Sequence, residues 1–253
     1  MPTVDQGELT DSMNSLDPVN VTHSDAPIQG YKAQLRDYFN GVGFARWSAI
    51  YGDAKLSRIR RTIRAGHQQM LATLHGWLAQ ANLPHGAHIL DAGCGTGILA
   101  VTLAQQGYTV TAVDIAPHMV HAATERAAAA GVAEQISFYT DDLEHIGGQY
   151  DAVICLDVLI HYPPELFTPM LHHLASLSRG PLYFTHAPYN HLLAALHWLG
   201  GHFPQNHRRT TIQMIPDAHV TAALAGAGMR QQHVANISSG FYFVRLLGAT
   251  PQS

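Results

Sequence analysis

The feature that most constrains this chain is the segment ILDAGCGTG at residues 89–97. An apolar run, predicted to be a strand over 88–92, leads into three glycines that alternate with single residues, and a helix is predicted directly after them. Glycines permit positive φ angles in a tight turn and let the backbone approach a ligand closely. The helix adds unpaired N–H groups at its N-terminus. The pattern therefore predicts that Gly93, Gly95 and Gly97 form a ligand-binding turn.

Two carboxylic acids flank this turn. Asp114 ends the next predicted strand, 109–114, and an acid at that place can accept hydrogen bonds from both hydroxyls of a ribose. Asp91, just before the turn, offers a carboxylate to an ammonium group. The GxGxG spacing differs from the GxGxxG of dinucleotide-binding proteins, and no Lys followed by Ser or Thr is present, which excludes a P-loop. A structural turn without a ligand is the alternative.

Strands and helices alternate through the rest of the chain. Besides the two strands above, strands are predicted over 136–140, 150–156 and 182–186, with a further pair within 230–247. Helices are predicted over 67–81, 98–106, 117–130, 165–177 and 217–226. Alternating units of this kind produce parallel strands with helices on both faces of the sheet. The predicted fold class is α/β, a doubly wound Rossmann-like fold with a seven-stranded, mostly parallel sheet and an antiparallel terminal strand.

Charge divides the chain into three parts. Residues 1–30 hold five Asp or Glu and no Lys or Arg, and we expect a disordered acidic leader. Residues 31–66 hold eight Lys or Arg against two Asp, interleaved with aromatic residues, and are predicted to form a helical arm. The arm either has a solvated basic face or covers a flat anionic ligand at the active site. Residues 67–253 form the ligand-binding domain, and 189–213 are a helical, substrate-binding insertion after the fifth strand.

Composition excludes several classes of protein. The 253 residues carry a net charge of −4 with 14 Lys and Arg, which argues against nucleic-acid binding. Two cysteines cannot form a disulfide framework, and the polar first residues contain no secretory signal. The apolar run 192–199 is too short to span a bilayer. We therefore expect a cytoplasmic protein, and attachment to a membrane surface stays open.

The turn and its acids resemble those of the class I S-adenosylmethionine-dependent methyltransferases. The resemblance implies that S-adenosylmethionine is the methyl donor and that Asp114 binds its ribose. It also implies that Ile115 and Met119 enclose the adenine, while Asp142 and Leu143 contact the polar edge of that base. For Met119, the residue alone leaves open the ordinary alternative of a core side chain.

A closer resemblance runs from residue 36 to residue 248. It is carried by RDYFNGVGFARWSAIYGD (36–53), IRRTIRAGHQQ (59–69), YDAVICLDVLIHYP (150–163) and FYFVRLLGA (241–249). These segments are similar to those of the magnesium-protoporphyrin IX methyltransferase family of chlorophyll and bacteriochlorophyll synthesis. The resemblance implies methyl transfer to one propionate carboxylate of magnesium-protoporphyrin IX, which gives the monomethyl ester. Magnesium then arrives only as part of the porphyrin, and no metal site on the protein is expected.

Individual roles follow from this resemblance. His161, just past the strand predicted over 150–156, is expected to hold the reacting carboxylate. Tyr51 is expected to close over the site and donate a hydrogen bond, with Tyr38 as its substitute. Arg64 is expected to bind the carboxylate of the methionine moiety, because a guanidinium matches a carboxylate in geometry. For each of these side chains, a purely structural role is the alternative.

A porphyrin is flat and largely apolar with two anionic tails, so its pocket is expected to be lined by aromatic groups. Tyr38, Trp47, Trp198 and Phe203 are the residues we assign to it. The family also implies a link to the porphyrin-carrying large subunit of magnesium chelatase and to photosynthetic membranes. Two other functions stay open. One is a porphyrin-binding carrier or assembly protein without turnover, and the other is an O-methyltransferase of another small molecule such as a quinone.

Overall fold

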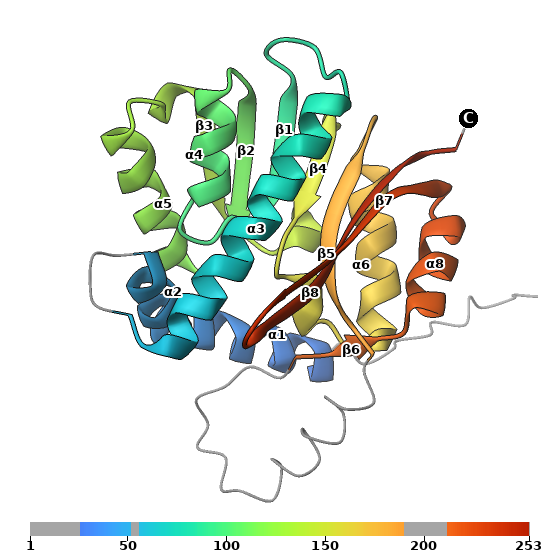
Figure 1. Cartoon of the computed structure of the whole chain (residues 1–253), viewed down its shortest axis with the longest axis horizontal. Coiled ribbons are helices and arrows are strands. Elements are labelled where there is room, and N and C mark those ends of the chain that lie inside the picture. Colours follow the sequence, from blue (N-terminus) through green and yellow to red (C-terminus); the bar gives the residue numbers. More distant parts are fainter. Residues whose placement is uncertain (1–25, 52–55, 190–211, 253) are drawn as a thin grey trace, which may run out of the picture.

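A computed structural model describes residues 26–51, 56–189 and 212–252. The predicted leader up to residue 25 lies outside the described residues, as do Trp198, Phe203 and most of the predicted insertion. Within the described ranges the chain forms one twisted sheet with helices on both faces, and two further helices lie across the carboxyl ends of its strands (Figure 1).

The sheet confirms the predicted fold class. Its strand order is β3-β2-β1-β4-β5-β8-β7. The strands are β1 (His88–Ala92), β2 (Thr109–Asp114), β3 (Ile136–Thr140), β4 (Ala152–Cys155), β5 (Leu182–Pro188), β7 (Met229–Ser239) and β8 (Tyr242–Pro251). The pairs from β3 to β5 are parallel, whereas β8 is antiparallel to both β5 and β7. An eighth strand, β6 (Met214–Ile215), pairs with the end of β5 and was not predicted, because two residues carry no periodic pattern.

Helices cover the sheet in two layers. The helices α3 (Arg58–Gln80), α4 (Ile98–Gln105) and α5 (Pro117–Ala129) pack on one face, and α6 (Pro164–Ser176) and α8 (Asp217–Gly226) pack on the other. Short 3₁₀ turns lie at Ala133–Gln135, Leu143–His145 and Leu159–His161. The predicted bounds of the helices that follow α3 are confirmed to within a residue or two at each end.

The pleat of the strands explains why both faces of the sheet are apolar. Successive side chains of a strand point to opposite faces, so Ile89 packs with α3 and α4 while its neighbour Leu90 packs with α6. Both side chains are fully buried. A parallel strand covered on both faces needs a continuous apolar run rather than an alternating one, and this is the pattern that predicted it.

The arm is helical, but its bounds differ from those expected. It consists of α1 (Ala26–Tyr38), a π-helical turn (Phe39–Gly43) and α2 (Phe44–Tyr51). Because α1 begins at Ala26, the predicted boundary of the leader at residue 30 lies inside a helix. Likewise α3 runs unbroken from Arg58 to Gln80, so residue 66 marks no division between the arm and the sheet domain.

Candidate active site

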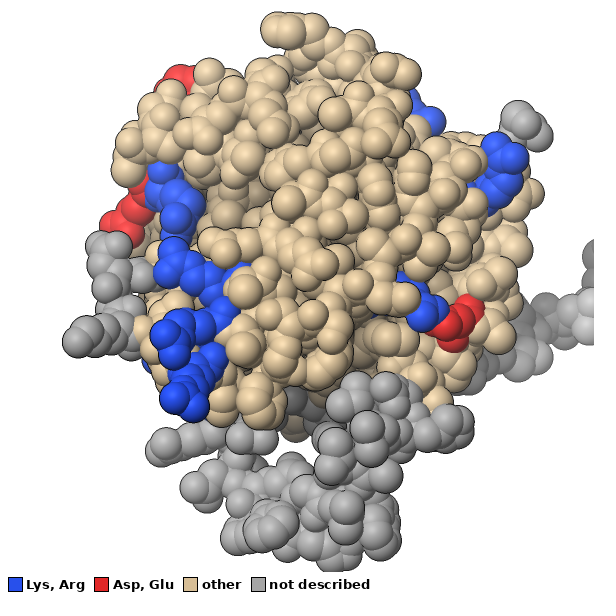
Figure 2. Space-filling view, viewed as in Figure 1, with Lys and Arg blue, Asp and Glu red and all other residues tan. Residues whose placement is uncertain are grey.

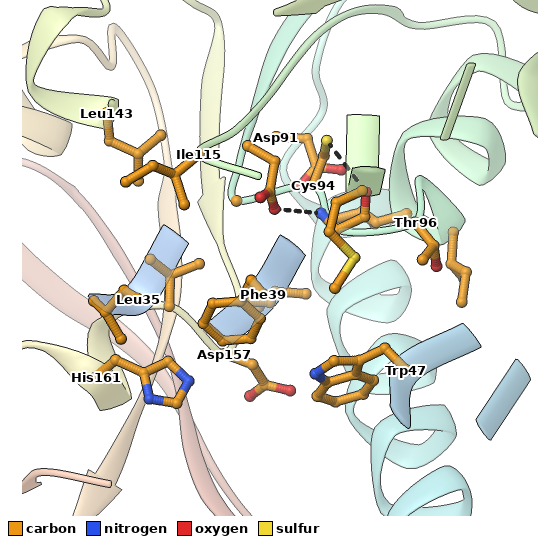
Figure 3. A pocket seen from close by; sticks show the side chains of 18 of the residues that line it. Leu35, Phe39, Trp47, Asp91, Cys94, Thr96, Ile115, Leu143, Asp157 and His161 are labelled. Carbon is orange, nitrogen blue, oxygen red and sulfur yellow. Dashed lines mark hydrogen bonds between the residues drawn. The ribbon is translucent and has the colours of Figure 1, made fainter. Parts of the chain in front are cut away.

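A pocket lies where the carboxyl ends of β1, β2 and β4 meet the arm. Figure 3 shows Asp91, Cys94 and Ile115 along one side and His161, Asp157 and Trp47 along the other. The full lining consists of Lys32, Leu35, Phe39, Trp47, Tyr51, His67, Leu71, Asp91, Gly93, Cys94, Gly95, Thr96, Ile98, Leu99, Asp114, Ile115, Met119, Asp142, Leu143, Leu156, Asp157, Val158, His161 and Tyr162. The pocket therefore joins residues that are as much as 130 positions apart in the chain.

The glycine turn forms the floor on the side of β1. Gly93 has a φ angle of 86°, and a Cβ at that position lies 2.1 Å from Cγ2 of Val158. Backbone N–H groups of Gly93 and Cys94 both donate to the carbonyl of Val113, at 2.8 and 2.9 Å. Strand β2 therefore holds the turn in place, and any side chain at residue 93 collides with the segment that follows β4.

Asp114 closes the turn from the end of β2. Its carboxylate accepts hydrogen bonds from the backbone N–H groups of Gly95 and Ala116, both at 2.9 Å. Burial raises the pKa of Asp114 to about 6, although these two hydrogen bonds oppose the shift. The acid lies beside the glycine turn, as its position in the sequence predicted.

Asp91 is a buried carboxyl group in which one oxygen lacks a hydrogen-bond partner. It is 2% exposed, and among the described residues its Oδ2 atom has no donor within hydrogen-bond distance. Burial, together with the charge of nearby Asp114, raises its pKa to about 7. A buried, unpaired carboxylate is unfavourable unless a cation satisfies it, so this side chain is suited to an ammonium group of a ligand.

Part of the pocket is lined by apolar side chains. Ile115, Met119 and Leu143 line it, as expected for a pocket for a flat base. Asp142 lies there too, but its Oδ2 is 3.0 Å from the ammonium nitrogen of Lys32 in α1. The carboxylate of Asp142 is therefore already paired with the arm rather than open to a ligand alone.

Lys32 was not predicted as a site residue. It is 4% exposed and pairs with both Asp142 and Glu144. Burial by itself lowers the pKa of a lysine, but the hydrogen bonds and charges of these two acids outweigh it, and the pKa of Lys32 is raised. Residue 32 lies in a basic, otherwise exposed stretch, so the sequence gives no sign of a partner more than 100 residues away.

An aromatic cluster from two helices forms the wall on the side of the arm. The rings of Trp47 and Tyr51 in α2 are stacked, with centroids 6.2 Å apart and planes 9° apart. The imidazole of His67 in α3 lies against both rings, and its Nδ1 atom is hydrogen-bonded to the hydroxyl of Tyr51. The structure thus brings Trp47 and Tyr51 to the pocket, as predicted, and adds His67.

His161 lies at the other end of this wall. It is 8% exposed, and its ring meets that of Phe39 edge to face at 5.3 Å. Its backbone carbonyl accepts a hydrogen bond from the hydroxyl of Tyr31 in α1, so the arm is fastened to the segment after β4 at this point. Phe39, a second lining residue that was not predicted, therefore helps to orient the imidazole.

Asp157, between β4 and His161, is a pocket-lining residue that sequence reasoning missed. It lies two residues past the end of an apolar strand, and Asp91 and Asp114 likewise lie at the carboxyl ends of their strands, so this shared position is the signal that could have found it. Its φ angle is 57°, in the left-handed region that few residues other than glycine, asparagine, aspartate and histidine adopt. Its carboxylate accepts hydrogen bonds from the hydroxyl of Tyr242 at 2.8 and 3.0 Å and from that of Thr185 at 3.2 Å.

Three predicted site residues do not line the pocket. Gly97 is the N-cap of α4, and a Cβ there lies 2.7 Å from that of Ala123 in α5, so this glycine serves helix packing. Tyr38 accepts a hydrogen bond from Arg46 within the arm, at 3.0 Å. Arg64 is partly exposed, one turn before His67 on α3, and does not reach the pocket. His67, which was not assigned a role from the sequence, is the residue of this part of α3 that lines the pocket.

These residues fit the methyl donor that the sequence implied. The unpaired oxygen of Asp91 matches an ammonium group, and Asp114 lies beside a turn too close-packed for any side chain at residue 93. The apolar side chains of Ile115, Met119 and Leu143 line the same pocket. The sheet, the glycine turn and the acid after β2 define a class I S-adenosylmethionine-dependent methyltransferase. A general methyltransferase-domain model matches residues 89–179.

Similarity to known proteins identifies one family within this class. A model of the magnesium-protoporphyrin IX methyltransferase C-terminus matches residues 155–251. The magnesium-protoporphyrin O-methyltransferase of Synechocystis is 41% identical over 86% of this chain and 95% of its own length. The chloroplastic magnesium protoporphyrin IX methyltransferase of Arabidopsis thaliana is 37% identical over 88% of this chain and 72% of its own length. The crystal structure of the Synechocystis enzyme with bound SAH has a TM-score of 0.79 and 40% identity, covering 88% of this chain and all of that one. The chain belongs to the magnesium-protoporphyrin IX methyltransferase family.

Proposed function

We propose that this chain transfers the methyl group of S-adenosylmethionine to a propionate carboxylate of magnesium-protoporphyrin IX and so forms the monomethyl ester. Family membership supports the activity. The observation that carries it in the structure is the juxtaposition of the unpaired Asp91 carboxylate with an aromatic wall that contains His161, across a single pocket (Figure 3). The donor side and the acceptor side thus face one another.

The donor supplies an activated methyl group on a cationic sulfur. Asp91 is placed to hold its ammonium group, and Asp114 is placed to accept from its ribose once the ligand displaces or shares the present backbone hydrogen bonds. Both carboxylates lie on the same side of the pocket, so the methyl group of the bound donor would be directed toward the aromatic wall. Two anions near a cationic donor also favour binding electrostatically.

The acceptor requires positioning rather than activation. A propionate has a reference pKa near 4, so it is ionised at neutral pH and needs no strong base. His161 is placed to donate a hydrogen bond to one carboxylate oxygen and to leave the other for attack. The rings of Phe39, Trp47 and Tyr51 exclude water, which strengthens electrostatic attraction between the anionic nucleophile and the cationic donor. Magnesium enters only within the porphyrin.

A turnover assay with magnesium-protoporphyrin IX and S-adenosylmethionine tests this function. We expect ester formation by the unchanged protein and a loss of about 10- to 100-fold in kcat for His161→Ala, because orientation of the nucleophile is lost. The control is His121→Ala, on the surface of α5 with its side chain 75% exposed, and it is expected to retain full activity. Porphyrin binding without any ester would support a carrier instead. Turnover of a quinone but not of the porphyrin would support an O-methyltransferase of another acceptor.

We further propose that the protein acts at the surface of a photosynthetic membrane and receives its porphyrin from the large subunit of magnesium chelatase. The partner rests on the family resemblance alone, and co-purification of the two proteins tests it. A basic and apolar surface supports membrane contact. It comprises Arg58, Ile59, Arg60 and Arg61 at the start of α3, together with Phe241 at the β7–β8 turn. Figure 2 shows Lys and Arg gathered there. Within the described ranges, no helix is long and apolar enough to cross a membrane.

A further inference from the structure

Four side chains from four different segments form a polar chain that ends at the pocket. Tyr51 of α2 is hydrogen-bonded to Nδ1 of His67 in α3. The Nε2 atom of the same imidazole is 3.9 Å from Oδ2 of Asp157, which follows β4. Asp157 in turn accepts from the hydroxyl of Tyr242 in β8. Because each side chain contacts the next one, the charge of Asp157 influences which atoms of His67 and Tyr51 carry protons.

The carboxylate of Asp157 sets the tautomer of His67. Burial lowers the pKa of His67, so the imidazole is neutral at neutral pH and carries one ring proton. A proton on Nε2 faces the negative charge of Asp157, whereas a proton on Nδ1 does not, and electrostatics therefore place it on Nε2. The Nδ1 atom is then an acceptor, and the hydroxyl of Tyr51 must be the donor in the bond between them.

This assignment reverses the role expected for Tyr51. Its only proton is committed to His67, so its oxygen can present only lone pairs to the pocket. Burial and the charge of Asp157 raise the pKa of Tyr51, and the residue therefore stays a neutral phenol rather than a phenolate. An oxygen lone pair repels a carboxylate acceptor, but it attracts the positively polarised C–H groups of a methyl on a cationic sulfur.

The backbone of Asp157 has an unfavourable conformation, which indicates that the surrounding contacts hold this residue in place. A non-glycine residue in the left-handed region is uncommon, and it persists where its surroundings fix it. Thr185 fixes it from two directions, because its hydroxyl accepts from the backbone N–H of Asp157 at 2.7 Å and donates to Oδ1 at 3.2 Å. Gly66 makes room for the ring of Tyr242, since a Cβ there lies 2.5 Å from that ring.

We propose that Tyr51 contacts the donor methyl as a hydrogen-bond acceptor, and that His67 and Asp157 are positioning residues which hold its proton away from the pocket. The proposal rests on the methyl donor of the proposed function and does not depend on the identity of the acceptor. It predicts that the hydroxyl of Tyr51 raises the affinity for S-adenosylmethionine but not that for S-adenosylhomocysteine. The second ligand has neither the methyl group nor the positive charge.

Calorimetric titration of both ligands tests this prediction. For Tyr51→Phe we expect the affinity for S-adenosylmethionine to fall by about two- to fivefold while that for S-adenosylhomocysteine is unchanged, since only the methyl contact is lost. The matched control is Tyr139→Phe, at a phenol on β3 that is 52% exposed and lies outside the pocket, and it should alter neither affinity. An equal loss for both ligands in Tyr51→Phe would make Tyr51 a packing residue and overturn the proposal.

A double-mutant cycle tests the positioning role. His67→Phe is expected to reduce the ratio of the affinity for S-adenosylmethionine to that for S-adenosylhomocysteine. In the double variant Tyr51→Phe/His67→Phe this ratio should be no lower than in Tyr51→Phe alone. His67→Gln retains a side-chain acceptor and should restore part of the ratio, whereas His75→Phe, two turns further along α3, should leave it intact. Additive losses would show that His67 acts independently of Tyr51.

The outcomes separate this proposal from the proposed function. Absence of ester from the unchanged protein, with the two ligands still distinguished through Tyr51, would overturn the porphyrin activity alone. Ester formation with no change of the affinity ratio in Tyr51→Phe would overturn the acceptor role alone. Failure of the unchanged protein to bind either ligand would overturn both.

Discussion

At the scale of single residues, Asp91 links ligand binding to proton binding. In the protein without ligand, burial and the charge of Asp114 raise its pKa to about 7, so near neutral pH a part of the molecules carries a protonated Asp91. An ammonium group can pair only with the ionised form. Binding of such a group therefore lowers the pKa of Asp91 and releases a proton.

The affinity for S-adenosylmethionine is accordingly predicted to depend on pH. It should fall by up to about tenfold per unit as the pH drops below about 7, where Asp91 becomes protonated. It should also fall above roughly pH 8, where a free α-amino group loses its own proton. Calorimetric titration across this range checks the curve.

Asp91→Asn is the control for the acidic limb of that curve. The amide cannot titrate, so the variant should bind weakly at every pH and lose the decline below about pH 7. A dissociation constant that does not change between about pH 6 and pH 7 in the unchanged protein would contradict the assignment.

Single residues also show how far sequence reasoning reaches in the site. Asp91 and Asp114 were predictable because each ends an apolar strand beside a glycine turn. Lys32 was not, because its burial depends on acids that the fold brings to it from more than 100 residues away. Gly97 was assigned to the ligand by its place in the motif, whereas its contact with Ala123 shows that close helix packing also requires glycine.

At the scale of elements, most of the fold could be predicted and the arm only in part. Helices α4 and α5 are each followed by a glycine with positive φ, Gly107 and Gly131, and such glycines mark helix ends in a sequence. The start of α3 was missed because Arg58 to Arg64 carry charges that hide the apolar periodicity, although Ser57 is a favourable N-cap and accepts from the N–H of Arg60 at 3.3 Å.

The arm is attached to the sheet domain by a small number of polar contacts. Lys32 pairs with Asp142 and Glu144 beyond β3, and Tyr31 donates to the carbonyl of His161. Asn40 accepts from the N–H of His118 at 3.0 Å and so satisfies a donor in the first turn of α5. These contacts place α1 and the π-helical turn over the pocket.

Removing the charge of Lys32 is predicted to loosen α1. Lys32→Met keeps the length of the side chain but leaves the buried Asp142 without its cation, and leaving a buried polar group unsatisfied should cost roughly 1–3 kcal/mol of local stability. The measurement is amide hydrogen exchange, which should become faster in α1 and remain unchanged in β1. Arg36→Met, at an exposed position one turn further along, is the control. Equal exchange in the two variants would show that the ion pair does not hold the arm.

At the scale of the whole molecule, charge is distributed unevenly. The net charge is −4, yet Arg58, Arg60 and Arg61 lie exposed on one helix beside two exposed apolar side chains (Figure 2). Those side chains are Ile59, which is 49% exposed, and Phe241, which is 70% exposed. Bases next to exposed apolar groups are typical of surfaces that bind anionic lipids.

We therefore predict binding to vesicles that contain phosphatidylglycerol and not to vesicles of phosphatidylcholine alone. Replacing Arg58, Arg60 and Arg61 with Gln should weaken binding by about fivefold per residue, since each base near an anionic surface contributes about 1 kcal/mol. Co-sedimentation at low and raised ionic strength measures this. The matched control is the double variant Arg179→Gln/Arg230→Gln, at exposed bases elsewhere in the chain. Equal sedimentation with both kinds of vesicle would exclude this surface as a lipid contact.

The division of the pocket between two parts of the chain also bears on how such enzymes diverge. The lining residues that we assign to the donor lie within 89–143, while those that we assign to the acceptor lie in the arm and at His161. A lineage can therefore exchange its arm and acquire a new acceptor while inheriting the donor half intact. Grafting an arm is thus a rational route to retargeting the catalyst.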